Sequence, residues 1–88
     1  MELVRKVRVK NTMGLHTRPA TAIVKLLQSC QSDVSFTYKK ETINAKSILS
    51  ILMLAARRNT TITITVRGSD APETMEKLVS AFDNKFGE

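Results

Sequence analysis

The chain contains few of the residues that build disulfides, metal sites or membrane segments. Among its 88 residues are one cysteine, one histidine and no tryptophan. One cysteine cannot form an internal disulfide, so the composition fits a reducing compartment, and Cys30 with His16 is too small a set for a zinc site. No apolar run approaches the length of a membrane span, and no signal-peptide pattern opens the sequence. We therefore expect a cytoplasmic protein without membrane insertion.

Acidic residues are scarce in most of the chain. Residues 1–69 carry twelve basic and three acidic side chains, a net charge of +9, whereas residues 70–88 carry two basic and five acidic ones, a net charge of −3. Such a basic body attracts nucleic acid, anionic lipid or an acidic protein surface. The length predicts a single domain, residues 1–88, and the hydrophobic content of 42% is enough for one core.

The apolar spacing alternates between strand and helix periods. Alternation of apolar and polar residues predicts four strands, near residues 4–10, 34–38, 42–44 and 61–66. Spacing of three and four predicts three helices, near residues 17–29, 45–54 and 71–86. Because each strand has one polar face, these elements fit an α+β fold, with one antiparallel sheet covered by helices on a single side.

Local signals mark the helix ends. Asp70 with Glu73 three residues later predicts a capping box at the third helix. The second helix is expected to start near Asn44 or Lys46, and the arginines after it, residues 57 and 58, suit its C-terminal end. This helix is apolar nearly all round, which a short helix on a small domain cannot bury completely. The alternatives are a deeply packed helix or an exposed docking patch, and we favour the patch.

A short motif before the first predicted helix contains the only histidine. Residues 14–20 read Gly-Leu-His-Thr-Arg-Pro-Ala, so His16 is expected where a strand has ended and a helix begins. The first N–H groups of a helix lack intrahelical partners and, with the helix dipole, form an anion site. An imidazole nitrogen there can accept a phosphoryl group, whose charge the N–H groups and the Arg18 guanidinium can hold. A lone histidine more often caps a helix or fills a loop, but its spacing from Gly14, Arg18 and Pro19 favours phosphoryl chemistry.

Residues 14–20 resemble the active-site signature of the HPr family, the histidine-containing phosphocarriers of the bacterial phosphoenolpyruvate-dependent sugar phosphotransferase system. Residues 44–48, Asn-Ala-Lys-Ser-Ile, resemble the regulatory serine segment of the same family. The resemblance covers essentially the whole chain. It implies an HPr-like open-faced β-sandwich, in which a four-stranded antiparallel sheet of order 1-4-2-3 carries three helices on one face.

The resemblance also implies a phosphocarrier rather than an enzyme, with no cofactor or metal of its own. His16 would accept a phosphoryl group from the phosphohistidine of Enzyme I and pass it to enzyme IIA domains. Arg18 would steady that group and the Thr17 backbone N–H would donate to it. Ser47 would be the regulatory target of an HPr kinase/phosphorylase. The protein is expected to be a monomer, with partners docking on four residues: Ile48, Leu49, Leu52 and Thr21.

Two other interpretations remain open. The chain could be a specialised HPr paralogue in a regulatory or nitrogen-related phosphorelay, an idea motivated by its strongly basic charge. A weaker alternative is nucleic-acid binding on the open sheet face, which requires exposed aromatic residues on which bases can stack. The polar face of the predicted strands carries lysine, arginine, serine and threonine but no aromatic residue.

Overall fold

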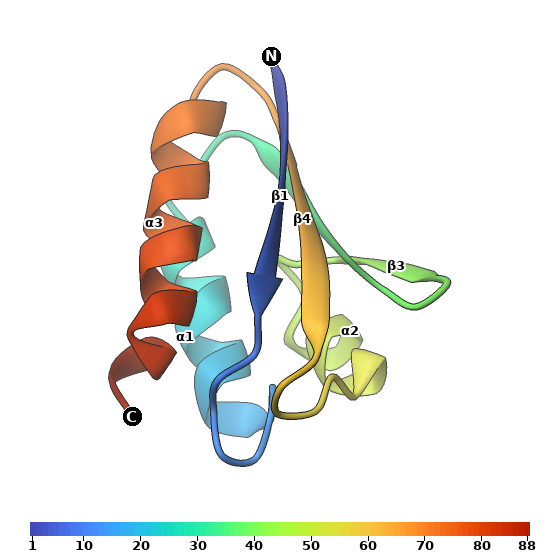
Figure 1. Ribbon diagram of the computed structural model, residues 1–88. Coiled ribbons are helices and arrows are strands. Elements are labelled where there is room, and N and C mark those ends of the chain that lie inside the picture. The colour runs from blue at the N-terminus through green and yellow to red at the C-terminus, as the bar shows by residue number, and fades with distance from the viewer.

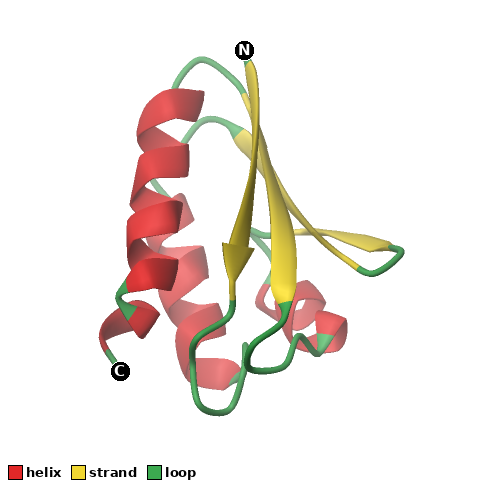
Figure 2. Ribbon diagram, viewed as in Figure 1, coloured by secondary structure: helices red, strands yellow, loops and turns green.

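One antiparallel sheet organises the computed structural model, which describes residues 1–88. Its strand order is β1-β4-β2-β3, as predicted. Helices α1 and α3 lie along one side of the sheet, and α2 lies below β3 in the view of Figure 1. The same view coloured by secondary structure separates the helical layer from the strands (Figure 2). In chain order the elements are β1 Glu2–Arg8, α1 Thr17–Leu27, β2 Asp33–Tyr38, β3 Glu41–Asn44, α2 Ile48–Leu54, β4 Thr61–Arg67, α3 Ala71–Asp83 and a 3-10 turn at Lys85–Gly87.

The core lies between the sheet and the helices. The central strand β4 contributes Ile62, Ile64 and Val66, all fully buried, while the threonines between them face away from the helices. Phe36 of β2 meets Phe82 of α3 edge to face, with ring centroids 5.8 Å apart. Each such apolar side chain stabilises the fold by about 1.5–3 kcal/mol on burial. The predicted alternation of β2 and β4 is therefore confirmed, whereas β1 ends at Arg8, two residues before the predicted Lys10.

Helix α1 is positioned by a narrow apolar stripe. Ala20, Ile23 and Leu27 are fully buried against the core. The helix starts at Thr17, as predicted, and ends at Leu27, two residues before the predicted Ser29. Pro19 lies in the first turn, where its missing N–H costs no hydrogen bond.

Helix α2 begins three residues later than predicted. The Asn44 side-chain oxygen accepts from the Lys46 N–H at 2.9 Å, which holds this segment in a turn rather than a helix. Ser47 is the N-cap: its hydroxyl oxygen accepts from the Ser50 N–H at 3.2 Å. Neither Asn44 nor Lys46 starts the helix, because each is already used in the preceding turn.

Helix α3 lacks the predicted capping box. The Asp70 carboxylate accepts from the backbone N–H groups of Gln31 and Ser32, each at 2.9 Å, and from the Ser32 hydroxyl, so it ties the α1–β2 loop to the start of α3. The helix ends at Asp83 rather than at the predicted Phe86, which lies in the following 3-10 turn with φ 52°. The Phe86 ring still packs edge to face on Phe82, 4.9 Å between centroids.

Candidate functional site

His16 is the N-cap residue of α1 and the last residue of the loop that connects β1 to α1. Its backbone is extended, at φ −84° and ψ −165°, and its imidazole makes no capping hydrogen bond, so the ring is free for other contacts. The preceding turn depends on Gly14, which has φ 68°. A Cβ at this position would collide with the Ala56 carbonyl oxygen and lie 3.0 Å from the Arg57 Cα, so the close approach of the two loops requires glycine.

Two backbone N–H groups at the start of α1 have no acceptor in the protein. The first intrahelical hydrogen bond runs from the Ala20 N–H to the His16 carbonyl at 3.0 Å, and Pro19 has no N–H to donate. The N–H groups of Thr17 and Arg18 are therefore the free donors of this helix end. The Arg18 side chain is exposed and makes no ion pair. The structure thus places His16, Thr17 and Arg18 together at one positive helix terminus.

His16 also lines a shallow hollow of about 560 Å³ between the His16 loop and the segment that follows α2. Leu52 forms part of its wall, and Arg57 and Arg58 close another side. The sequence predicts that these arginines suit the C-terminal end of α2. That helix ends at Leu54, as expected, its last turn contains no basic residue, and the left-handed Ala55 is its C-cap. The presence of the two arginines beside His16 could not be read from the sequence, because it results from the pairing of two loops distant in the chain.

Hydrogen bonds on both sides hold the His16 loop in place. The Leu15 N–H donates to the Ala56 carbonyl at 3.0 Å, immediately before His16. On the other side, the buried Asn11 side chain donates to the Lys85 carbonyl at 2.8 Å and to the Glu88 carboxylate at 2.9 Å. Hydrogen bonding to Thr12 lowers the pKa of the Glu88 carboxyl. The residues after α3 therefore brace the loop that carries His16.

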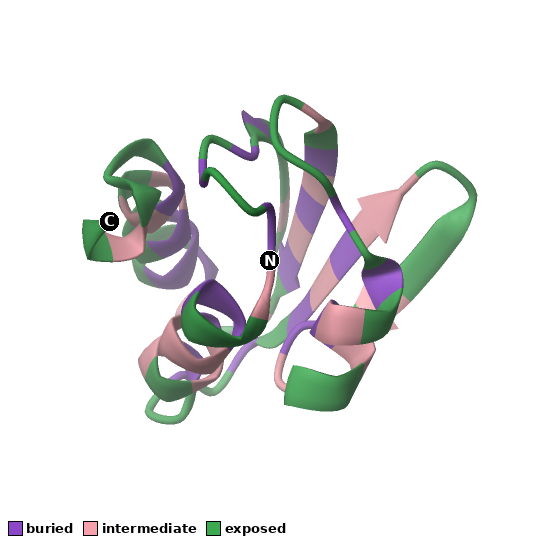
Figure 3. Ribbon diagram, turned by 90° about the horizontal axis from the view of Figure 1, so that it is seen from below, coloured by how far each residue is buried: buried purple, intermediate pink, exposed green.

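An apolar patch on α2 neighbours this hollow. Leu49 is 67% exposed and Met53 is 72% exposed, whereas Ile51 and Leu54 face the core. The view from below shows this division, with exposed and half-buried residues on the outer side of α2 (Figure 3). The expected exposure of one side of the helix is confirmed. Of the other predicted docking residues, Ile48 is 38% exposed and Leu52 lines the His16 hollow, whereas the Thr21 hydroxyl donates to the Thr17 carbonyl within α1.

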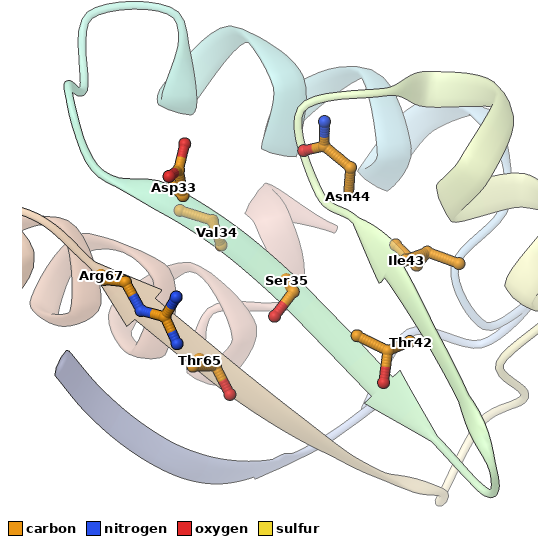
Figure 4. Close-up of a pocket in the computed structure, with 8 residues that line it drawn as sticks. All are labelled: Asp33, Val34, Ser35, Thr42, Ile43, Asn44, Thr65 and Arg67. Atoms are coloured by element: carbon orange, nitrogen blue, oxygen red, sulfur yellow. The ribbon is translucent and has the colours of Figure 1, made fainter.

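A second hollow lies on the open face of the sheet, over β2 and between its two neighbouring strands, β3 and β4 (Figure 4). It measures about 410 Å³ and shares no residue with the His16 hollow. Its lining comprises Asp33, Val34, Ser35, Thr42, Ile43, Asn44, Thr65 and Arg67. No aromatic side chain is available there for stacking, so this face lacks what the nucleic-acid interpretation requires.

Comparison with known proteins decides the family. The family model for the HPr component phosphorylation site of the phosphotransferase system matches residues 3–84. The chain belongs to the HPr family. It is 47% identical to the phosphocarrier protein HPr of Chlamydia pneumoniae over 87 residues, which cover 99% of this chain and 81% of that protein.

Solved HPr structures share the fold. HPr of Thermoanaerobacter tengcongensis superposes with a TM-score of 0.94 at 30% identity, over 98% of this chain and 97% of that one. A second structure from that organism, described as an HPr dimer, gives a TM-score of 0.79 at 32% identity, over 93% and 94% of the two chains. The HPr-like sheet order and the phosphocarrier identity of this chain are therefore established, while its expected monomeric state stays a prediction. None of its helices has the length and apolar character to cross a bilayer.

Proposed function

We propose that His16 is the phosphoryl acceptor of this HPr protein, and that it carries the group from Enzyme I to enzyme IIA domains during sugar uptake in the cytoplasm. The observation that carries the proposal is the free helix end at His16. Two unpaired N–H groups, from Thr17 and Arg18, adjoin an imidazole with no capping bond. The unpaired Arg18 guanidinium adds a cation with the planar geometry that suits phosphate.

The transfer is a direct exchange of one phosphorus–nitrogen bond for another. A His16 ring nitrogen attacks the phosphorus of the donor's phosphohistidine, the donor's N–P bond breaks, and the donor imidazole leaves with the bonding electron pair. The donor ring takes up a proton from solvent as it leaves, and the His16 ring loses its N–H proton to solvent, so that both rings end neutral and the protons balance. Such a step needs in-line positioning and charge stabilisation more than covalent assistance, and the helix end supplies the charge stabilisation.

Intact mass after incubation with phosphoenolpyruvate, magnesium and a bacterial Enzyme I tests this proposal. One acid-labile phosphoryl group is expected on the protein and none on His16→Ala. Arg18→Ala should keep the acceptor but slow its phosphorylation. Onward transfer is then measured to a sugar-specific IIA and to a nitrogen-related IIA, and preference for the latter would favour the specialised paralogue. A His16→Ala protein that is still phosphorylated would contradict the assignment.

The patch on α2 is the docking surface in this proposal, with Ile48, Leu49, Leu52 and Thr21 facing the partner. Leu49→Asn removes one exposed anchor without opening the core. We expect the KM of Enzyme I for the carrier to rise about fivefold, equivalent to about 1 kcal/mol, with kcat unchanged. Val4→Asn is a matched control, because Val4 is 56% exposed on the open sheet face. Equal KM values for both variants would exclude α2 from the interface.

Ser47 is the proposed regulatory site, modified by an HPr kinase/phosphorylase. Its hydroxyl is half-buried at the N-terminus of α2, where a phosphate favours the helix electrostatically and leaves the fold intact. The added charge would lie beside the apolar docking residues and weaken association. Ser47→Asp keeps a capping oxygen and adds charge, and Ser47→Asn keeps a cap without charge. Slower transfer from Enzyme I to the aspartate variant alone is expected, and equal rates for both variants would oppose this role.

A further inference from the structure

Arg57 and Arg58 supply positive charge beside His16 and form no ion pair with a carboxylate of the protein. Both line the same hollow as His16. The structure contains two ion pairs, Lys10–Asp83 and Arg67–Glu2, and neither involves these arginines. Unpaired guanidinium groups are usually well solvated on surfaces. Here they lie beside His16, at a helix end that already has two free N–H groups, so several hydrogen-bond donors surround the imidazole.

The backbone of these arginines is fixed relative to His16. The Leu15 N–H bonds to the Ala56 carbonyl at 3.0 Å, which joins the two loops one residue before His16 and one before Arg57. The Arg57 carbonyl accepts from the Thr60 N–H at 3.2 Å and from the Thr60 hydroxyl at 2.6 Å. The turn is then joined to the residue that follows β1, because the Asn59 N–H donates to the Val9 carbonyl at 2.7 Å. The arginine stems thus start from a rigid frame, and only their side chains have to move toward an anion.

Resting on the proposed function of His16, we propose that Arg57 and Arg58 form a second cationic wall of the phosphoryl site and bind the phosphoryl oxygens opposite Arg18. A phosphoryl group on histidine presents three oxygens that share a charge near −2. Two N–H groups and the Arg18 guanidinium leave acceptor capacity on those oxygens. The forked donors of a guanidinium fit that geometry, and they stabilise the charge of the transferring group.

Chemical phosphorylation with potassium phosphoramidate tests this wall without any partner protein. The His16 nitrogen attacks the reagent's phosphorus, the P–NH2 bond breaks, and ammonia leaves with the imidazole proton. The rate constant is measured by intact mass for wild type, for Arg57→Ala/Arg58→Ala, and for a control with the same loss of charge, Arg5→Ala/Lys77→Ala. Arg5 and Lys77 are exposed and line neither side of the His16 hollow.

We expect the rate constant of the Arg57→Ala/Arg58→Ala protein to fall about tenfold, and that of the control to fall by less than about twofold. In wild type, phosphorylation should also shift the NMR resonance of at least one of the two Nε–H groups, and that of Arg5 should stay in place. Equal rate constants for the two double variants would overturn the wall. If the rates are equal and only the KM for Enzyme I rises, the arginines serve partner docking instead, which also overturns it.

The same experiment separates this inference from the proposed function. A His16 that reacts with phosphoramidate but accepts nothing from any Enzyme I would refute the proposed donor and leave the arginine comparison valid. A chain that accepts from Enzyme I normally but shows no arginine effect in either assay would retain the carrier function and lose only the second wall. Circular dichroism of each variant verifies that the fold is unchanged.

Discussion

At the scale of single residues, two positions beside the His16 hollow have left-handed backbone conformations, and only one of them is a glycine. Gly14 adopts φ 68° with glycine, whereas Ala55 adopts φ 53° and ψ 39° with a side chain. A left-handed conformation costs an alanine about 1–2 kcal/mol, and glycine almost nothing. Gly14 is therefore unstrained, and the close contact there permits no side chain. Ala55 is strained, and replacing it with glycine would remove that strain.

Gly14→Ala should destabilise the protein and disturb the site together. The substitution adds left-handed strain of about 1–2 kcal/mol and forces the methyl group against the Ala56 carbonyl, which accepts the Leu15 hydrogen bond. We expect a loss of about 2 kcal/mol or more in the free energy of unfolding, measured in urea, and slower phosphorylation of His16. Gly87→Ala is the control, because a Cβ at Gly87 meets no atom within 4 Å. Wild-type stability in Gly14→Ala would contradict the close approach of the two loops.

Ala55→Gly should do the reverse. Ala55 is exposed and follows α2 in the position where helices commonly place glycine. Relief of strain outweighs the extra entropy of glycine in the unfolded chain, so we expect stabilisation by about 0.5–1 kcal/mol. Thermal unfolding measures the change, and Ala22→Gly, inside α1, provides a glycine that should destabilise instead. A drop in melting temperature for Ala55→Gly would argue against a strained residue at the end of α2.

At the scale of secondary-structure elements, long-range hydrogen bonds decide what local patterns leave open. Residues 14–20 predicted the location of His16 correctly, and the alternation of β4 predicted its buried face. These features depend on neighbours in sequence, so periodicity and capping rules suffice for them. The capping box at Asp70 failed for the opposite reason. The carboxylate binds Gln31 and Ser32, nearly forty residues away, and no local rule contains that contact.

The same limit applies to the candidate site. His16, Thr17 and Arg18 are consecutive, so a single sequence motif contains all three. Arg57 and Arg58 lie beside His16 because the Leu15–Ala56 hydrogen bond joins two loops that are distant in the sequence. The sequence shows two consecutive arginines after a predicted helix, and such residues commonly interact with the negative C-terminal end of that helix. A sequence pattern therefore indicates the His16 motif but not the arginines that the fold brings beside it.

The Asp70 contact predicts a dependence of stability on acid pH. Hydrogen bonds from the Ser32 hydroxyl, and from the Gln31 and Ser32 backbone, lower the pKa of the Asp70 carboxyl to about 2. Because the Asp70 pKa is lower in the folded than in the unfolded state, the ionised carboxylate stabilises the fold fully when the pH is above the unfolded-state pKa of about 3.9. This stabilisation is lost as the pH falls through the folded-state pKa of about 2. We expect Asp70→Asn to unfold more easily than wild type at pH 7, with the difference shrinking between about pH 4 and pH 2.

Urea unfolding at a series of pH values measures that difference. Asp83→Asn serves as a control, since Asp83 makes only a long, exposed contact of 3.4 Å to Lys10. Its difference from wild type should be small at every pH. A difference for Asp70→Asn that is constant from pH 7 to pH 2 would mean that the carboxylate charge does not strengthen the link between α3 and the α1–β2 loop.

At the scale of the whole molecule, basic residues outnumber acidic ones over most of the chain. The formal net charge is +6, and three acidic residues, Glu73, Glu76 and Asp83, lie on α3, which packs beside β1. Arg18, Arg57 and Arg58 make no ion pair, although the Glu88 carboxylate lies at the same end of the molecule and accepts from the Thr12 N–H. Such an arrangement orients the molecule in the field of an acidic partner and raises the rate of encounter.

This orientation predicts that phosphorylation by Enzyme I depends on ionic strength through association rather than chemistry. The Debye length falls from about 30 Å at 10 mM to about 8 Å at 150 mM salt, which screens the arginines from a distant acidic surface. We expect kcat/KM to fall about tenfold over that range, with kcat nearly constant. Arg18→Gln/Arg58→Gln should flatten this dependence and Arg5→Gln/Lys77→Gln should leave it steep, because only the first pair lies at the His16 end. A kcat/KM insensitive to salt in wild type would mean that the unpaired arginines act on the bound phosphoryl group and not on the approach of its donor.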